Sequence, residues 1–269
     1  TAAVSVAENQ TVATTVTSSD VDGGAPVYSI AGGADAALFT INPTTGVLSF
    51  NSAPNYEAPA DAGANNVYDV TVQVSDGAGG ADTQAIAVTV TNANEAPLIT
   101  SNGGGGTANI NAAENQTAVT TVTSSDVDGG AAVYSIAGGA DAALFTINAS
   151  TGALTFLAAP NFEAPADAGA DNVCDVTVQV SDGNGGTDTQ AIAVTVTNVN
   201  EAPLITSNGG GATASVSAAE NQSVATTVTA SDVDGGAAVY SIVGGADAAL
   251  FMINASTGAL TFLAAPNFE

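Results

Sequence analysis

The clearest pattern along the chain is a strict alternation of apolar and polar residues, which predicts β-strands. In residues 68–74, Tyr-Asp-Val-Thr-Val-Gln-Val, every second side chain is apolar, so one face of the strand is apolar and the other polar. Residues 86–91 repeat this alternation, and the glycine-rich segment 75–80 between the two stretches is typical of a hairpin connection. Shorter stretches predict four earlier strands, at residues 11–17, 27–30, 38–41 and 47–50.

These strands recur because the sequence is a tandem repeat. The tetrapeptide Ala-Glu-Asn-Gln places its glutamate at Glu8, Glu114 and Glu220, so 106 residues separate successive copies. Residues 18–42 recur as residues 124–148 with a single change. Short strands separated by turn signals predict an all-β fold, with Greek-key β-sandwiches of roughly 100 residues arranged end to end. The predicted units are repeat 1 (residues 1–106), repeat 2 (107–212) and repeat 3 (213–269).

Repeat 3 covers only the first half of the period and lacks the two strands with the best alternation. Half a sandwich exposes its core and a sheet edge, so it should not be stable alone. We expect that the natural chain continues beyond Glu269, or that a neighbouring copy supplies the missing strands; the first is the simpler idea. The single cysteine, Cys174, stands where repeat 1 has Tyr68, so a small buried core residue is predicted, with a reactive or crosslinking thiol as the alternative.

The composition excludes several classes of function. The 269 residues include 26 Asp and Glu and no Lys, Arg or His, for a formal net charge of −26. Without Lys or Arg side chains, the chain cannot bind nucleic acid or an anionic membrane surface by the usual electrostatic contacts. A lysine isopeptide crosslink is excluded as well. Without histidine, Ser-His-Asp and Cys-His sites and His-ligated metals are excluded. A chain that is 45% hydrophobic and 10% charged folds rather than staying disordered, and no apolar run is long enough to span a membrane.

Many of the carboxylates lie at the turns and ends of each unit. In repeat 1, Glu8 follows the opening strand, Glu57 closes a Pro-Asn-Tyr-Glu segment, Asp76 begins the hairpin loop and Glu95 lies at the exit. Because loops at one end of a sandwich cluster in space, these groups would repel one another. A hard divalent cation resolves the repulsion, since Ca²⁺ takes about 6–8 oxygen ligands from carboxylates, amides and water.

Six motifs occur in a fixed order. They are Ala7-Glu8-Asn9, Asp20-Val21-Asp22, residues 39–46 (Phe-Thr-Ile-Asn-Pro-Thr-Thr-Gly), Pro54-Asn55-Tyr56-Glu57, Val74-Ser75-Asp76-Gly77 and Asn92-Ala93-Asn94-Glu95-Ala96-Pro97. This set resembles the cadherin repeat, particularly the cadherin-like tandem repeats of large bacterial surface proteins, and the resemblance covers all three units. It implies cadherin- or immunoglobulin-like sandwiches with Ca²⁺ bound between successive repeats.

The resemblance also implies the calcium ligands of each joint. At the first joint they are Glu8, Glu57, Asn92, Asn94 and Glu95 with Asp126, Asp128 and Asp182 of the next repeat. At the second joint they are Glu114, Glu163, Asn198, Asn200 and Glu201 with Asp232 and Asp234. The partner of Asp182 in repeat 3 would lie beyond residue 269.

The sequence departs from the family pattern in ways that reduce the charge. Asn55 and Asn161 stand where the family has Asp, and the linker reads Asn-x-Asn-Glu-Ala in place of Asp-x-Asn-Asp-Asn. These losses point to fewer ions at each joint, one in place of three. A glycine-rich insert at residues 101–106 would either loosen the joint or form an ordered loop against it.

A different role for the acids is a solvated surface that keeps a long polymer soluble. For four acids of repeat 1 that fall outside the motifs, this solvated role is the expectation: Asp35, Asp61, Asp69 and Asp82.

The leading functional hypothesis is mechanical. The resemblance implies a non-enzymatic segment of a repetitive extracellular adhesin, matrix fibre or surface filament, stiffened by Ca²⁺ at the cell surface. It would associate into a fibre or continue in a longer array. The alternative is a secreted carbohydrate- or ligand-binding module for a glycan or cell-surface ligand, for which Tyr28, Phe39 and Tyr56 are the few aromatics. A two-carboxylate glycosidase is least favoured, because nothing predicts a cleft.

Overall fold

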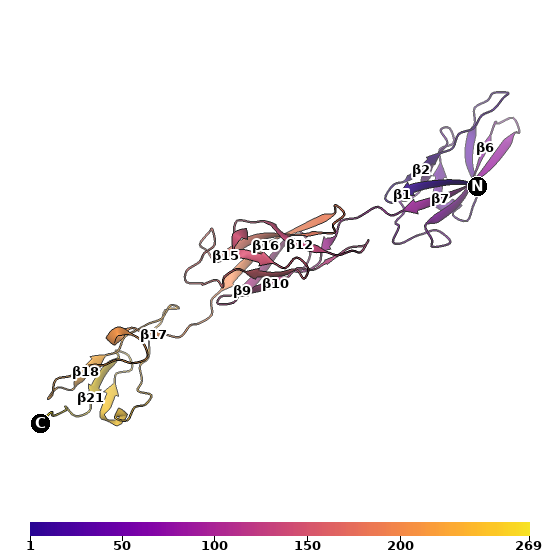
Figure 1. Ribbon diagram of the computed structural model, residues 1–269. Helices are drawn as coiled ribbons and strands as arrows, with labels where there is room; N and C mark the ends of the chain where they lie inside the picture. The colour runs from indigo at the N-terminus through magenta and orange to yellow at the C-terminus, as the bar shows by residue number, and fades with distance from the viewer.

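The computed structural model describes residues 1–269 as three β-rich bodies joined end to end (Figure 1), one for each copy of the sequence period. The two termini lie at opposite ends of this rod. All regular structure is β-strand apart from four short 3₁₀ helices, so the predicted all-β fold is confirmed. None of these helices has the length and apolar character needed to cross a membrane.

Repeat 1 is a sandwich of two sheets, ordered β1-β7-β6-β3 and β2-β5-β4. Its elements are β1 (Ala2–Ala7), β2 (Val12–Thr15), β3 (Val27–Gly32), η1 (Ala36–Leu38), β4 (Phe39–Ile41), β5 (Val47–Phe50), β6 (Val67–Ser75) and β7 (Ala81–Thr91). All six strands predicted from the alternation are present, although Leu38 belongs to η1 rather than to a strand. The apolar face of β6 packs Tyr68, Val70 and Val72 into the core, as the pattern predicts.

Repeat 2 has the same two sheets, ordered β12-β15-β16-β9 and β10-β14-β13, with a short extra pair in which β8, from the preceding linker, joins β11. Its elements are β8 (Leu98–Ile99), β9 (Thr107–Ala113), β10 (Ala118–Thr121), β11 (Ser124–Ser125), β12 (Val133–Gly138), η2 (Ala142–Leu144), β13 (Phe145–Ile147), β14 (Ala153–Phe156), β15 (Val173–Ser181) and β16 (Thr187–Thr197). Its core is a single cluster that joins Phe145, Leu154 and Phe156 of the smaller sheet to valines of β15 and β16.

The first strand of each complete repeat lies parallel to the last. β1 runs beside β7, and β9 runs beside β16 with Thr107 opposite Ala191 and Ala113 opposite Thr197. The chain therefore enters a repeat at one end of the sandwich and leaves it at the other. This pairing explains why the repeats extend into a rod rather than folding back on one another (Figure 1).

The linker after repeat 1 is built into the core of repeat 2. β8 pairs with β11, and the Ile99 side chain is only 1% exposed within the repeat 2 core. The glycine-rich insert that follows is an ordered loop, which decides between the two expectations for it. The Asn102 amide donates to Gln190 Oε1 (3.1 Å), and Gln190 Nε2 donates to the Gly105 carbonyl (3.0 Å).

Residues 204–269, which add the linker to repeat 3, form only the smaller sheet, ordered β18-β21-β20, together with the short pair of β17 and β19. These elements and the two 3₁₀ helices beside them are β17 (Leu204–Ile205), η3 (Ser207–Gly209), β18 (Val224–Thr227), β19 (Ala230–Ser231), η4 (Ala248–Leu250), β20 (Phe251–Ile253) and β21 (Ala259–Phe262).

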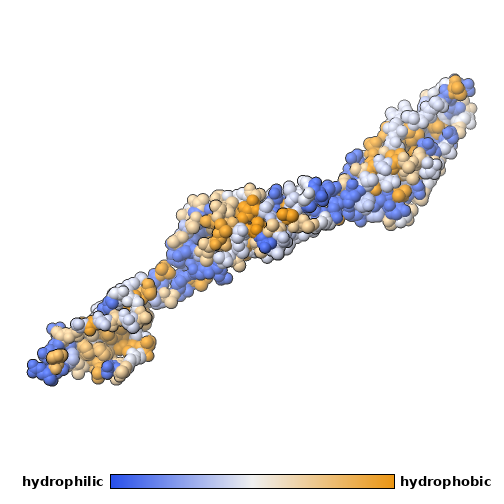
Figure 2. Space-filling model, viewed as in Figure 1, coloured by the Kyte–Doolittle hydropathy of each residue, from blue (hydrophilic) through white to orange (hydrophobic).

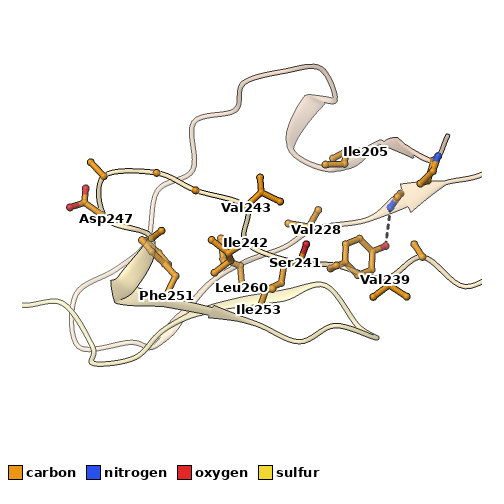
Figure 3. A pocket seen from close by; sticks show the side chains of 18 residues that line it. Ile205, Val228, Val239, Ser241, Ile242, Val243, Asp247, Phe251, Ile253 and Leu260 are labelled. Carbon is orange, nitrogen blue, oxygen red and sulfur yellow. Dashed lines mark hydrogen bonds between the residues drawn. The ribbon is translucent and has the colours of Figure 1, made fainter.

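The apolar side of the small sheet in repeat 3 faces an open groove of about 670 Å³. Ile242, Phe251 and Leu260 point toward this groove (Figure 3), and apolar surface is conspicuous on this body in Figure 2. In repeats 1 and 2 the larger sheet covers the corresponding face. The groove agrees with the expected exposure of the half sandwich. That further chain or a neighbouring copy covers it stays a prediction.

Cys174 lies in the core of repeat 2, as predicted, with 4% of its surface exposed. Burial raises the pKa of its thiol to about 11, and the negative charge of Asp141 adds to the effect. The thiol therefore stays protonated near neutral pH, and only the thiolate is a good nucleophile. The structure favours the core role over the reactive thiol.

Candidate metal centres at the joints

Each joint gathers three glutamates whose carboxylate oxygens lie within 4.8 Å of one another. At the first joint Glu8 follows β1, Glu57 lies between β5 and β6, and Glu95 lies in the linker after β7. At the second joint the equivalent set is Glu114, Glu163 and Glu201. Hydrophilic surface is concentrated at both joints (Figure 2). The sequence has no Lys, Arg or His side chain to neutralise these groups.

Glu8 is the fixed member of the first group. Its side chain is 1% exposed, Oε2 accepts a hydrogen bond from Tyr56 N–H (2.8 Å), and Oε1 accepts one from Ala93 N–H (2.9 Å). One carboxylate thus ties together the end of β1, the loop before β6 and the linker. Buried carboxylates are stable only when such donors or a cation compensate them.

Glu114 repeats this arrangement at the second joint. Its oxygens accept hydrogen bonds from Phe162 N–H (2.9 Å) and Val199 N–H (2.8 Å). The two joints are therefore built on the same local design.

Acids of repeat 2 reach across the first joint. Asp128 Oδ2 accepts a hydrogen bond from Glu95 N–H (2.6 Å), and Asp126 Oδ1 accepts one from Asp128 N–H (3.0 Å). The Asn94 amide donates to Asp182 Oδ2 (2.7 Å). The Glu95 N–H lowers the pKa of Asp128 the most, and a hydrogen bond from the Asn92 side chain adds to the effect. The structure thus places all eight residues predicted for this joint around the linker.

The second joint has the matching contacts. Asp234 Oδ2 accepts from Glu201 N–H (2.6 Å), and Asp232 Oδ1 accepts from Asp234 N–H (3.2 Å). The Asn198 amide donates to Glu163 Oε1 (3.2 Å), and the Asn200 amide donates to the Glu201 carbonyl (2.7 Å). The seven residues predicted here also lie together.

Sequence reasoning missed one contributor at each joint. The Asn9 amide donates to Glu95 Oε1 (2.5 Å), and the Asn115 amide donates to Glu201 Oε1. Both asparagines have left-handed backbones, with φ of 62° and 60°. Asparagine adopts this conformation more readily than most residues, and its place directly after the repeated glutamate was the available signal.

A glycine lets the linker approach repeat 2 closely. A Cβ at Gly186 would lie 2.8 Å from Ala96 Cα and 3.0 Å from the Glu95 carbonyl oxygen, so no side chain fits there. Two residues further on, Asp188 Oδ2 accepts a hydrogen bond from Ile99 N–H (2.8 Å). The linker is therefore held along its length by repeat 2.

The expectation of a solvated surface was wrong for two of the four acids outside the motifs. Asp35 and Asp61 are only 4% and 6% exposed, whereas Asp69 and Asp82 are exposed. Asp35 accepts hydrogen bonds from Ala62 N–H (2.7 Å) and Asp69 N–H (2.8 Å). Asp61 accepts hydrogen bonds from the backbone of the loop that follows it. These backbone donors compensate the two buried charges in place of cations.

Four carboxylate oxygens at the joints are buried and have no hydrogen-bond partner: Glu95 Oε2, Asp128 Oδ1, Glu201 Oε2 and Asp234 Oδ1. At each joint one of them belongs to the linker and the other to the following repeat. A buried, unpaired, charged oxygen is costly, and these are the hard oxygen ligands that Ca²⁺ prefers. The residues present therefore fit a bound calcium ion.

The pKa values at the joints show competing effects. Desolvation raises the pKa of Glu57, and the charges of Glu8, Glu95 and Asp128 add to this rise. Desolvation likewise raises the pKa of Glu201. By contrast, the Glu95 backbone N–H holds the pKa of Asp128 below its ordinary value.

We expect opposite pH effects in the presence and absence of calcium. A raised carboxyl pKa stabilises the folded state below the unfolded value near 4.5, and this contribution is lost as the pH rises through the folded value. In EDTA, the melting temperature should therefore fall as the pH rises above about 4.5. Calcium affinity should rise over the same interval, because the ligands must lose their protons.

Thermal melts at pH 5, 6 and 7 in EDTA and in Ca²⁺, at constant ionic strength, check these directions. A melting temperature in EDTA that rises steadily from pH 5 to pH 7 contradicts the first expectation. Below about pH 3.8, both conditions should lose stability progressively. The lowered pKa values of Asp128, Asp182 and Asp234 contribute stability that is complete above 3.8 and is lost as the pH falls through their folded values.

Comparison with known families agrees with this geometry. Residues 2–91 match the cadherin domain family, and residues 94–195 match a bacterial Ig domain family. The first repeat is thus similar to a cadherin domain and the second to a bacterial Ig domain. No curated protein matches the sequence.

Solved cadherin ectodomains are similar in fold to this chain. Mouse Cadherin-23 EC22-24 is 20% identical with a TM-score of 0.55, over 99% of this chain and 86% of that one. Human CDH23 EC21-23 is 19% identical with a TM-score of 0.58, over 99% and 88%. Drosophila N-cadherin EC1-4 is 15% identical with a TM-score of 0.51, over 100% and 66%. At these identities the likeness concerns the fold, including the end-to-end order of the repeats.

Proposed function

We propose that this chain is a structural segment of an extracellular adhesin, matrix fibre or surface filament, in which Ca²⁺ stiffens the joints. The unpaired buried oxygens at both joints carry the proposal, because each joint presents one from the linker and one from the following repeat. The proposed repeats are residues 1–106, 107–212 and 213–269, with the end of the first linker, from Leu98 to Gly106, packed on repeat 2. Cadherin-type domains are extracellular and belong to adhesion-type proteins, which supports a location outside the cell.

The joint residues divide the work of holding a cation. Glu8 is fixed by two backbone donors, and Glu57 and Glu95 extend the group with oxygens less than 4.8 Å away. Asp128 brings an oxygen from the next repeat. A calcium ion bound here would supply the positive charge that the chain lacks and would oppose bending, since bending would pull its ligands apart. The same roles fall to Glu114, Glu163, Glu201 and Asp234 at the second joint.

The observations support a structural role more than the alternatives. A carbohydrate-binding face needs several exposed aromatic rings, but Tyr28 and Phe39 are buried, which leaves only Tyr56 of these three exposed, at 38%. The three glutamates of each group lie at a joint, where Glu8 and Glu114 accept hydrogen bonds from backbone N–H groups. We therefore propose a non-enzymatic segment whose partners are further repeats, or copies of itself in a fibre.

Calcium titration of the full chain tests the proposal. Ca²⁺ should raise the melting temperature and increase the maximum dimension measured by small-angle X-ray scattering, since a stiffer joint keeps the rod extended. EDTA should reverse both changes, and NaCl at matched ionic strength should not reproduce them. An identical melting temperature and scattering curve in Ca²⁺ and in EDTA would contradict the calcium proposal.

A further inference from the structure

Repeat 2 contains an apolar cavity that repeat 1 fills with a tyrosine. The cavity has a volume of about 250 Å³ and is lined by Leu144, Phe156, Pro160, Cys174 and Val196, among others. Cys174 occupies the position of Tyr68, 106 residues earlier in the repeat. A thiol is much smaller than a phenol ring, so the difference between the two repeats leaves space inside repeat 2.

Repeat 1 shows what this space accommodates. The Tyr68 ring meets Phe50 edge to face, with centroids 5.1 Å apart and planes at 81°, and meets Phe39 at 6.3 Å and 85°. Its hydroxyl accepts a hydrogen bond from Ala60 N–H (3.1 Å). The site in repeat 1 thus has a flat apolar part and one polar anchor at its far end.

Repeat 2 keeps both parts of the site without the tyrosine. Phe145 and Phe156 remain stacked, with centroids 4.6 Å apart, and Phe156 lines the cavity. Ala166, which corresponds to Ala60, also lines it. Since Cys174 has no hydroxyl at the end of a ring, the anchor at Ala166 N–H is left to another molecule.

The mouth of the cavity has also become apolar. Leu157 replaces Asn51, whose amide donates to the Ala37 carbonyl (2.9 Å) in repeat 1, and Ala158 replaces Ser52. The Leu157 side chain is 65% exposed at the rim. An exposed leucine beside an apolar cavity favours entry of an apolar ligand.

We propose that the cavity beside Cys174 binds a small neutral phenol, with its ring against Phe156 and its hydroxyl at Ala166 N–H. A dry apolar cavity of about 150 Å³ is known to bind benzene in another protein, so this one has room for a single substituted ring. Asp167 also lines the cavity. Its carboxylate, like the strongly negative chain as a whole, disfavours an anionic ligand, so the class is phenols rather than aromatic acids.

The test uses p-cresol, which has the chemical structure of a tyrosine side chain, and the full chain in constant Ca²⁺. Calorimetric titration should find one site per chain. At p-cresol concentrations 100-fold above Kd, the ratio of folded to unfolded repeat 2 should rise about 100-fold. Toluene should bind about 2–10-fold more weakly, because it lacks the hydroxyl. Benzoate should not bind.

Two variants exchange the site between repeats. Cys174→Tyr should fold, because repeat 1 accommodates tyrosine at this position, and it should abolish p-cresol binding. Tyr68→Cys should create a second site, which raises the stoichiometry from one to two. Undiminished binding to Cys174→Tyr, or no p-cresol binding to the unaltered chain, overturns the proposal. If Tyr68→Cys fails to fold, the Cys174→Tyr result decides alone.

Discussion

Replacing Glu114 with alanine is expected to abolish calcium binding at the second joint and to destabilise repeat 2 even without calcium. The carboxylate is buried and accepts hydrogen bonds from Phe162 N–H and Val199 N–H, so both donors would lose their partner. Two hydrogen bonds to a charged acceptor contribute about 3–6 kcal/mol together, given the usual range for such bonds. Calcium affinity should fall by more than about 100-fold, since even indirect metal partners are worth 10–100-fold.

Calorimetric unfolding and calcium titration of the full chain measure the two losses separately. Glu114→Gln keeps the size and one acceptor oxygen, so it should lose calcium affinity and have a metal-free stability between those of the unaltered chain and Glu114→Ala. Glu220→Ala is the matched control in repeat 3, where the glutamate is exposed and one oxygen accepts a bond from Phe268 N–H (3.1 Å). A Glu114→Ala chain that still gains full stability from calcium would show that this glutamate is not a ligand.

Replacing Asp141 with alanine should destabilise repeat 2 by about 2–5 kcal/mol, equally with and without calcium. Asp141 is buried away from the joints, and its two oxygens accept hydrogen bonds from Ala168 N–H (2.7 Å) and Asp175 N–H (2.8 Å). Alanine would leave two donors unpaired and detach the loop after β14 from β15. Thermal melts of the variant in Ca²⁺ and in EDTA measure this loss.

Asp247→Ala provides the comparison for this second prediction. Asp247 holds the same position in repeat 3, where its side chain is exposed, so its loss should change stability by less than about 0.5 kcal/mol. Asp141→Asn should be intermediate, because the amide retains one acceptor oxygen. A loss in Asp141→Ala that disappears on adding calcium would assign this residue to the metal site instead.

The sequence predicted the parts of the fold that depend on local pattern. Alternation alone located β6 and β7, because a strand with one buried face must be apolar at every second residue. It did not reveal that β1 runs parallel to β7, since alternation specifies a face and not a neighbour. The joints were found because their ligand motifs are short and recur in order.

The wrong or missed predictions at the site have a common cause. The surroundings of these residues depend on groups that lie far away in the sequence. Asp35 looked like a solvated turn residue, but its burial relies on the N–H groups of Ala62 and Asp69. Asn9 was passed over because its acceptor, Glu95, lies 86 residues away. Cys174 was correctly placed in the core, yet the cavity beside it depends on neighbours that keep the arrangement they have around Tyr68.

The parallel pairing of the first and last strands determines how each repeat would respond to tension. A force that pulls the two ends of repeat 2 apart acts on the start of β9 and on the end of β16. Because the two strands are parallel, it pulls them in opposite directions along their common axis. The seven residue pairs between Thr107–Ala113 and Ala191–Thr197 are then loaded in shear, and all must yield together rather than one after another. Each complete repeat should therefore resist a stretching force until it unfolds in a single abrupt step, whether or not calcium is bound at its joints.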